Sequence, residues 1–348
     1  MDASLASYLQ VVSPHLQPEL ASAPALRQVQ ALGEYLPVPS AALLECRLDA
    51  SDPAIDLHAS YTHVPQGFSS RFASNSAWQA CKALGQAWSN PNDCLQSSIR
   101  NLILEFDLPS HSTQSSLATI SPSPYVMFQP NLPVELPVLL NHVLTLWQRL
   151  PDPLLAANLK TCLEGIPKEA ELANIGVWLA RPTQAVRLTI KDINLEQILA
   201  YLEKIGWQDP TQAFMSAAVT LSPLTEVLAL AIDIDSALHS RIGLECFATA
   251  EFHDPNRWQQ LIDHLVKTDL CTPAKRQALL TWPGVTQWSD CPDRWPANLT
   301  YGDLLMGAHA VSLFWRKINH IKLVYQPGQP LSAKAYLAFG HRWISRDR

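Results

Sequence analysis

The sequence predicts an α+β fold: an antiparallel β-barrel of about ten strands, built from about five αββα repeats and surrounded by helices. Three observations support this expectation. Segments in which apolar and polar residues alternate come in pairs, turn-forming residues join each pair, and helical patterns separate one pair from the next. Strands joined by short turns are antiparallel, and a sheet with this many strands tends to curl and close.

The chain is long enough for one large core, since 47% of its 348 residues are hydrophobic and no linker is evident. We therefore expect a single domain over residues 1–348. A helical segment covers residues 1–40, the barrel repeats cover residues 41–340, and residues 341–348 form a C-terminal tail.

The first repeat is predicted from two alternating segments. Leu43–Leu48 and Ala54–Thr62 form a hairpin, and Ser51-Asp52-Pro53 supplies its turn. A helix over Ser76–Ser89 follows, because large apolar side chains recur there at helical spacing. This order of hairpin and helix is the unit that the rest of the chain repeats.

The second repeat contains the hairpin Asn101–Leu108 with Tyr125–Gln129. Its two strands are separated by a Ser- and Pro-rich stretch, which is too polar for the core and is expected to be a mobile loop. Helices over Val134–Leu150 and Pro153–Glu164 follow.

The third hairpin, Ile175–Ala180 with Ala185–Asp192, turns at a short segment containing proline. Asn194 is a predicted N-cap for a helix over Leu195–Ile205, and a further helical stretch covers Thr211–Leu221.

The fourth hairpin is Val227–Asp233 with Arg241–Thr249. Two helices are predicted after it, over residues 254–270 and 272–280, because Asp254-Pro255 and Thr272-Pro273 are both typical helix starts.

The last repeat begins with a loop or extended arm over Trp282–Pro296 and a helix over Tyr301–Trp315. The fifth hairpin pairs His320–Gln326 with Ala333–Phe339 across the turn sequence Pro327-Gly328-Gln329-Pro330.

Composition limits the possible partners and the compartment. The net charge is −6 and the pI is near 6.0, so no overall positive field favours nucleic acid or anionic lipid. No apolar run approaches the roughly 20 residues of a membrane span, and the N-terminus lacks a secretory signal. The cysteines are odd in number and form no CxxC pair, so we expect reduced thiols, with no disulfide framework and no zinc site, in a soluble, cytoplasmic protein. They are Cys46, Cys81, Cys94, Cys162, Cys246, Cys271 and Cys291.

The strand patterns predict which face of the barrel points inward. In the last hairpin, Lys322 and Lys334 alternate with apolar residues, and Arg187 and Arg241 do the same in earlier strands. Helices must cover the apolar face, so the polar face lines the lumen. The alternative is an open sheet whose polar face is in water.

The cations on inward positions are the strongest candidate site. Four of them meeting in a lumen would repel one another unless an anion or carboxylates neutralise them. An anionic diphosphate is one solution, and pairing with Glu245 and Asp233 is the other. Lys334 and Tyr336 form a K-x-Y element that places an aromatic ring beside a charge, and such a ring attracts ligand cations. The inward cations are Arg187, Arg241, Lys322 and Lys334.

With these residues the sequence resembles the ABBA aromatic prenyltransferases, whose fold is the PT barrel. The resemblance implies a prenyl diphosphate bound by Arg187, Arg241, Lys322 and Lys334. It also implies a carbocation shielded by Tyr336, Phe247 and Trp178, and a proton accepted by Glu45, the first-strand acid, or by Glu105. It implies an aromatic or peptide acceptor and no resident metal, with Mg²⁺ as an optional ion.

Two alternatives stay open. The second predicted strand has no arginine, which favours a barrel that binds a peptide or small metabolite without ionisation chemistry. A hydrolase using Glu45 with Asp56, or Glu105 with Asp107, is the other. Asp233 and Asp235 are a candidate metal pair, although no DDxxD motif is present.

Overall fold

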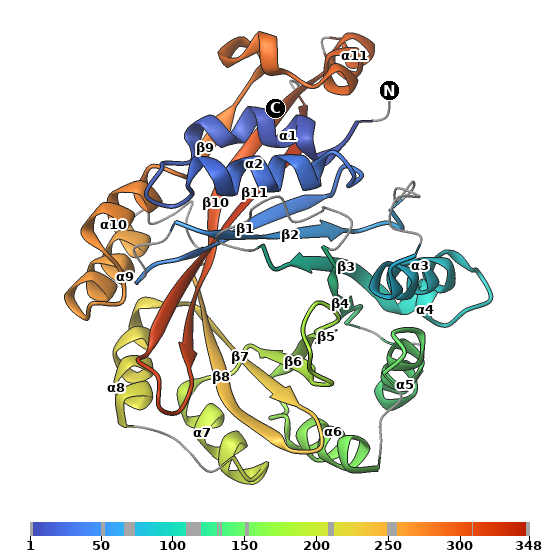
Figure 1. Ribbon diagram of the computed structural model, residues 1–348, viewed down its shortest axis with the longest axis vertical. Coiled ribbons are helices and arrows are strands. Elements are labelled where there is room, and N and C mark those ends of the chain that lie inside the picture. The colour runs from blue at the N-terminus through green and yellow to red at the C-terminus, as the bar shows by residue number, and fades with distance from the viewer. Residues whose placement is uncertain are drawn as a thin grey trace.

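A closed antiparallel sheet forms the centre of the protein (Figure 1). The computed structural model describes residues 3–49, 53–65, 74–108, 120–130, 132, 134–149, 153–207, 212–248, 256–307 and 309–345. Ten strands form a ring, because β10 pairs with both β8 and β11, and β11 pairs with β1. The strands of the ring are β1 (Ala41–Arg47), β2 (Ile55–Tyr61), β3 (Ile99–Phe106), β4 (Ser123–Phe128), β5 (Glu171–Val177), β6 (Val186–Lys191), β7 (Val227–Ile234), β8 (Leu238–Phe247), β10 (Ala310–Tyr325) and β11 (Ser332–Ser345). The predicted closed barrel is confirmed, and the alternative of an open sheet is wrong.

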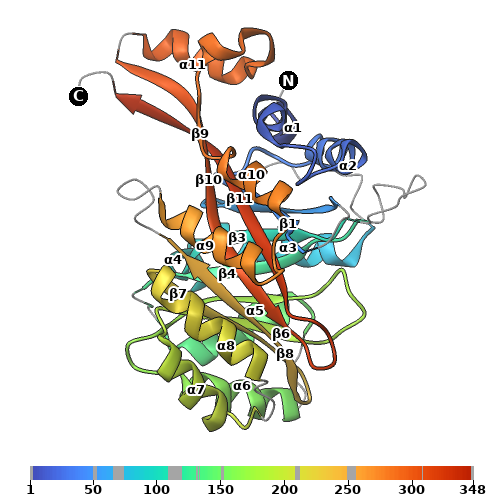
Figure 2. The ribbon, with the colours of Figure 1, turned by 90° about the vertical axis from the view of Figure 1, so that its left-hand side faces the viewer.

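Helices surround the ring, as Figures 1 and 2 show. Several begin where the sequence predicts a cap: the Asn194 side chain accepts from Gln197 N in a capping box, and Thr272 Oγ1 accepts from Lys275 N. The helices are α1 (Leu5–Val12), α2 (Ala23–Gly33), α3 (Ser76–Ser89), α4 (Leu95–Ser98), α5 (Leu136–Leu146), α6 (Pro153–Gly165), α7 (Leu195–Lys204), α8 (Gln212–Leu221), α9 (Asn256–Lys267), α10 (Pro273–Leu280) and α11 (Ala297–Met306).

The main core lies between the sheet and these helices. Each strand contributes alternate apolar side chains to it, such as Leu57 on β2, Leu188 on β6 and Leu323 on β10, which are fully buried. This burial supplies most of the driving force for folding, because it removes apolar surface from water. It also sets the register, since a shift by one residue would turn the apolar side chains of a strand into the lumen.

The helix predicted over Tyr301–Trp315 is wrong in its second half. Helix α11 ends at Met306, and Gly307 follows it with φ at +55°. Strand β10 then begins at Ala310. The sequence misleads here because Leu313 and Phe314 are both buried, so the strand lacks the alternation of a half-buried strand. The Phe314 ring packs edge-on against Tyr8 of α1.

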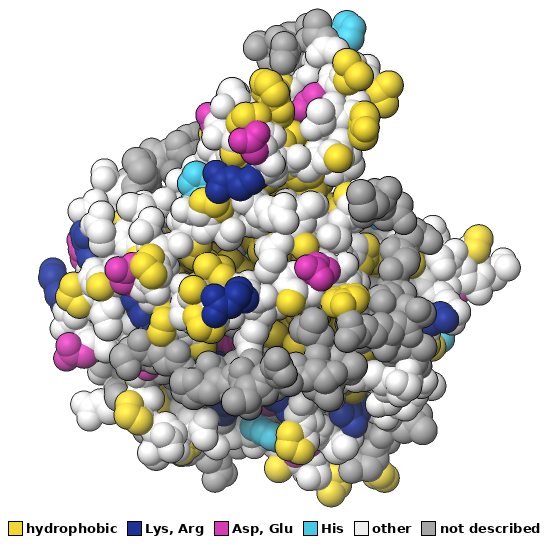
Figure 3. All heavy atoms as spheres, turned by 45° about the horizontal axis from the view of Figure 1, so that its top comes forward, with side chains coloured by type: hydrophobic (Ala, Val, Ile, Leu, Met, Phe, Trp, Pro, Cys, Tyr) yellow, Lys and Arg dark blue, Asp and Glu magenta, His cyan; other side chains and the backbone are white. Residues whose placement is uncertain are grey.

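The tail predicted over residues 341–348 is also wrong as far as Ser345. Strand β11 continues to that residue and pairs with the start of β10, from Ala310↔Ser345 to Phe314↔His341. A short strand, β9 (Gly284–Thr286), adds to β10 within the predicted extended arm. Together these segments form a ribbon that projects beyond the ring (Figure 2), and this part of the molecule stands out from the main body in Figure 3.

Some expectations fall outside the described residues. They are the start of the first hairpin's turn, at Ser51 and Asp52, the helix start at Asp254-Pro255, and most of the predicted mobile loop before Tyr125. No helix among the described residues is long and apolar enough to cross a membrane. All seven cysteines are free thiols, as predicted.

The end of β11 gives a test of the ribbon. A chain ending after Gly340 loses the pairing of Ala310–Phe314, while a chain ending after Ser345 keeps it. Each backbone hydrogen bond contributes about 1 kcal/mol net, so the shorter chain should lose at least about 2 kcal/mol of unfolding free energy. Urea unfolding of both chains measures the difference, and equal midpoints would show that residues 341–345 are a tail after all.

Candidate active site in the barrel lumen

The lumen holds a cavity of about 400 Å³ that all ten strands of the ring line. Its size is in the range of small-molecule sites. The predicted inward residues Glu105, Arg187, Phe247, Lys322 and Tyr336 line it. The alternation of the strands therefore places the polar face inward, as the sequence predicts.

The two ends of the barrel differ. The hairpin turns gather at one end, where Arg47 pairs with Asp56 at 3.5 Å and Arg181 pairs with Asp107 at 2.5 Å. The other end, where the helical connections begin, contributes cationic residues to the cavity lining, namely Arg100, Lys191 and Lys317. Ion pairs thus fill the hairpin end, and cations surround the opposite end.

Glu45 organises the lumen near the seam between β1 and β11. Register pairing places Glu45 opposite Tyr336, and its carboxylate accepts hydrogen bonds from Lys334 Nζ and the Tyr336 hydroxyl. His58 Nε2 lies 3.6 Å from the same carboxylate. Burial would raise the pKa of Glu45, but the positive charge of Lys334 and hydrogen bonding more than offset it and hold the pKa well below its usual value. Glu45 is therefore an ionised carboxylate and a weak base.

Four aromatic rings form a continuous row across the lumen. The Tyr336 and His320 rings are stacked with centroids 4.0 Å apart, and Phe247 lies 4.8 Å beyond His320. His58 meets the other side of the row, edge-on to Tyr336 at 5.4 Å. Burial lowers the pKa of His320 to about 4, so this imidazole is a neutral ring at neutral pH.

The predicted diphosphate cations on β6 and β10 are each paired with a carboxylate. Arg187 donates to both oxygens of Asp233 at 2.7 Å, and Lys322 Nζ donates to Glu245 at 2.9 Å. Despite burial, Lys322 holds the pKa of Glu245 at about 2. The sequence allows two ways to neutralise the inward cations, a diphosphate or pairing with Asp233 and Glu245. The pairing with Asp233 and Glu245 is present.

Lys334 and Arg241, the other two predicted diphosphate cations, differ in whether a carboxylate pairs with them. Lys334 is directly opposite Lys322 in the β10–β11 register, and each of these like charges pairs with its own carboxylate, Lys334 with Glu45 and Lys322 with Glu245. Neither Lys334 nor Arg241 is among the residues that line the cavity. No ion pair joins Arg241 to a carboxylate among the described residues. Burial and the nearby charge of Arg187 lower the pKa of Arg241.

Trp178, a predicted shield residue, lies against cations. The guanidinium carbons of Arg181 and Arg187 are 3.6 and 4.3 Å from its ring centroid, and its Nε1 donates to Asp233 at 3.3 Å. Trp178 is not among the residues that line the cavity. Two guanidinium groups already lie over its ring, which leaves the shielding of a ligand to other rings.

Three lumen residues are not among the predicted site residues, although the strand pattern places His320 near the predicted cations. His58 and His320 complete the aromatic row, and Tyr125 lines the cavity with a buried hydroxyl that has no hydrogen-bond partner. Their inward positions could be found from alternation, but their ring contacts depend on distant strands. A β-bulge between Ile318 and His320 also shifts the alternation, so that Lys317 faces the lumen together with Lys322.

The candidate metal pair Asp233 and Asp235 is not brought together as a clamp. Asp233 bonds Arg187, whereas Asp235 bonds His239 at 2.7 Å and accepts from Ala237 N in the turn after β7. In the lumen, Glu45, His58 and Glu105 place one ligand atom each within 4.8 Å of the others. The Glu45 oxygens are already bonded to Lys334 and Tyr336, so this group is a poor site for a cation.

No protein-family model matches the sequence, and no curated protein matches it. Solved structures do match. The 6-dimethylallyltryptophan synthase from Micromonospora olivasterospora, in complex with DMASPP and Trp, aligns with a TM-score of 0.54 over 96% of this chain and 97% of that one, at 11% identity. The apo form of the prenyltransferase PriB gives 0.54 over 96% and 94%, at 12% identity. This chain has the PT-barrel fold.

The match extends over nearly the whole PT barrel. A binary complex of PriB with product diphosphate gives a TM-score of 0.50 over 97% of this chain and 96% of that one, at 13% identity. These solved structures hold DMASPP with Trp and diphosphate, respectively. At this identity the likeness is one of fold, and the lumen of this PT barrel must be judged by its own residues.

The ring of Tyr125 leaves no space for a side chain at Gly176 on β5. A Cβ atom at Gly176 would be 2.0 Å from Tyr125 Cδ1, closer than any real contact. Gly176→Ala should push the ring into the cavity and cost about 1–3 kcal/mol of unfolding free energy. Gly85→Ala in α3 is the matched control, because its Cβ meets Val64 at an ordinary 3.5 Å and alanine favours a helix. Thermal unfolding of both variants measures the contrast, and equal stability would refute the close contact.

His320 gives a pH test of the aromatic row. Its pKa falls from 6.5 to about 4 on folding, so the unfolded chain takes up the proton first as the pH falls. Stability present above pH 6.5 is therefore lost as the pH falls towards 4. Between pH 7 and 5, the unfolding free energy of His320→Phe should fall by about 2 kcal/mol less than that of the wild type. Urea midpoints across this range, with the exposed His63→Phe as control, measure the slope. Parallel curves for His320→Phe and the wild type would contradict the assignment.

Proposed function

We propose that this protein is a prenyltransferase that moves an allylic prenyl group from a prenyl diphosphate to an aromatic or peptide side-chain acceptor. The observation that carries the proposal is the aromatic row of Phe247, His320, Tyr336 and His58 beside Lys322 in a closed lumen. Ring faces attract cations, and adjacent ammonium groups attract a leaving diphosphate. The lumen contains both elements within one small cavity.

The proposed reaction begins when the bond between the allylic carbon and the diphosphate oxygen breaks. The electron pair leaves with the diphosphate, whose charge is taken up by Arg187 and Lys322, the two predicted diphosphate cations that line the cavity. The allyl cation lies against Tyr336, His320 and Phe247, where His320 is neutral and adds no repulsion. An electron-rich acceptor carbon or heteroatom then forms the new bond and releases a proton.

Glu105 is favoured over Glu45 as the group that takes this proton. Lys334 holds the pKa of Glu45 well below its usual value, so Glu45 is a weak base, and it fixes Lys334 and Tyr336 in place instead. Glu105 lines the cavity and accepts one bond from Arg181 at 3.2 Å. Mg²⁺ remains an optional ion in this scheme, and the free thiols support a cytoplasmic location.

Because Lys322 is paired with Glu245, variants that each remove one charge of this pair test whether the diphosphate binds at Lys322. Lys322→Met removes a cation and should weaken binding of a thio-linked dimethylallyl diphosphate analogue by at least about tenfold. Glu245→Gln keeps a hydrogen-bond acceptor for Lys322 but removes the competing carboxylate charge, so a diphosphate at Lys322 should bind more tightly. Calorimetry measures both, with the exposed Lys204→Met as control. Changes of the same sign in the two lumen variants would place the diphosphate elsewhere.

The aromatic row predicts which change at Tyr336 is tolerated. Tyr336→Phe keeps the ring and should retain most turnover, whereas Tyr336→Leu loses an attraction of about 2 kcal/mol and should slow turnover about thirtyfold. Mass spectrometry of products from dimethylallyl or geranyl diphosphate with a panel of aromatic and peptide acceptors measures both. A Leu variant as fast as the Phe variant would remove Tyr336 from the cation site.

A second candidate function is a PT barrel that binds a peptide or small metabolite without catalysis. The pairing of Arg187, Lys322 and Lys334 with carboxylates favours it, because these pairs cancel much of the positive charge. This candidate predicts that the wild type binds an acceptor from the panel but no diphosphate analogue. Diphosphate binding with product formation would exclude it.

A further inference from the structure

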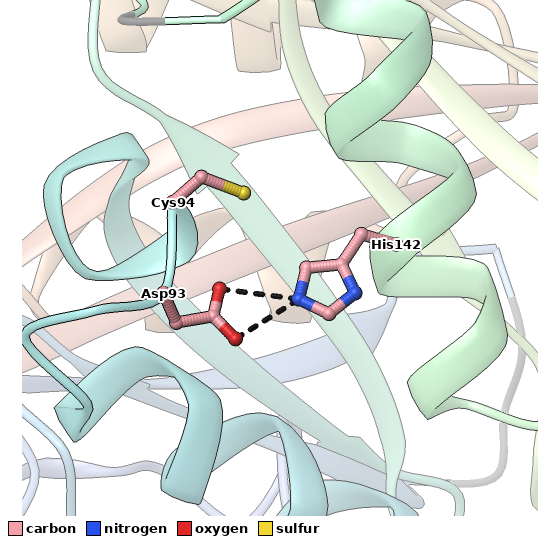
Figure 4. Close-up of side chains that lie close together, drawn as sticks. All are labelled: Asp93, Cys94 and His142. Carbon is pink, nitrogen blue, oxygen red and sulfur yellow. Dashed lines mark hydrogen bonds and ion pairs between the residues drawn. The ribbon is translucent and has the colours of Figure 1, made fainter.

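A cluster of three different metal-binding side chains lies outside the lumen. Asp93 and Cys94 precede the short helix α4, and His142 belongs to α5 (Figure 4). Their ligand atoms all lie within 4.8 Å of one another. Figure 4 shows both side chains of the α4 segment directed toward the imidazole. We propose that Asp93, Cys94 and His142 form a Zn²⁺ site on the outer surface of the barrel.

The donor set favours zinc over other common ions. A thiolate, an imidazole nitrogen and a carboxylate oxygen are the three ligand types that Zn²⁺ accepts in proteins. Ca²⁺ and Mg²⁺ take oxygen ligands and have no use for the sulfur of Cys94. Three protein ligands leave a fourth tetrahedral position for water, as in open zinc sites.

The geometry is close to that of a tetrahedral site. Tetrahedral bonds of ordinary length place a nitrogen and an oxygen ligand about 3.3 Å apart. The Nε2 atom of His142 is 3.0 and 3.1 Å from the two Asp93 oxygens. Asp93 is also fixed by Leu95, whose N–H donates to its Oδ1 at 2.9 Å. A shift of a few tenths of an ångström would admit the ion between nitrogen and oxygen, and the Cys94 sulfur, which lies within 4.8 Å of both, would move in to complete the site.

Without a metal, the three side chains form one polar cluster. Asp93 pairs with His142, and the Cys94 thiol hydrogen-bonds to the Asp93 carboxylate. Bound Zn²⁺ would replace that hydrogen bond with a metal–sulfur bond, because a coordinating thiol loses its proton to solvent. The lumen group of Glu45, His58 and Glu105 differs, since Lys334 already supplies its positive charge.

Bound zinc would link the segment before α4 to α5 through its ligands. These elements belong to the first and second repeats and lie next to each other outside the sheet (Figure 1). The site does not line the lumen, so the proposal does not depend on the prenyl chemistry. Metal binding would stabilise the folded chain by mass action.

The test is a Co²⁺ titration of the full chain after removal of metals with a chelator. A near-ultraviolet sulfur-to-cobalt charge-transfer band should appear with one equivalent of Co²⁺ and vanish when Zn²⁺ displaces it. Cys94→Ala should abolish the band, and His142→Ala should weaken Zn²⁺ binding at least about 100-fold in competition with a chromophoric chelator. Cys291→Ala and His264→Ala are matched controls and should behave as the wild type.

Circular dichroism shows whether each variant is folded, and Cys94→Ala removes only one sulfur from a partly exposed position. A Zn²⁺-dependent rise in melting temperature should occur in the wild type and in Cys291→Ala but not in Cys94→Ala. The proposal is overturned if the wild type gives no charge-transfer band. It is equally overturned if the band persists in Cys94→Ala, or if His142→Ala keeps its Zn²⁺ affinity.

Discussion

The pairing of β1 with β11 is the contact on which the rest of the structure depends. It joins the first and last strands of the ring and closes the sheet, and it places Glu45 opposite Tyr336 and Arg47 opposite Lys334. Without closure the polar strand faces would be in water, where the ion pairs between them would contribute little. Closure buries those pairs, makes each partner necessary to the other, and leaves a small cavity between them.

The lumen shows how a protein with a net charge of −6 holds several cations close together. Arg187, Lys322 and Lys334 each have their own carboxylate, supplied by a neighbouring strand. The carboxylates fix the positions of the cations before any ligand arrives. An entering anion would bind cations whose side chains are already oriented. Its affinity would depend on how readily the carboxylates release those cations.

Much of the fold could be predicted from the sequence, because period-two alternation, turn residues and helix caps are local signals. Helix α3 was predicted at its observed bounds, Ser76–Ser89. The start of β10 could not be found, since Leu313 and Phe314 are buried on both faces and alternation is lost. The inward positions of Lys322 and Tyr336 were predictable, but their partners were not, because register between strands far apart in sequence decides them.

The bulge between Ile318 and His320 limits how the number of residues in β10 can change. One extra residue in β10 allows Lys317, at the end of the barrel opposite the hairpin turns, and Lys322, deeper in the lumen, to face the same way. Deleting a codon there would turn half of the strand inside out, moving either the rim cation or the aromatic row into the apolar layer beneath the helices. A substitution along β10 changes one side chain, whereas a change of length at this point reorients every side chain on one side of the bulge.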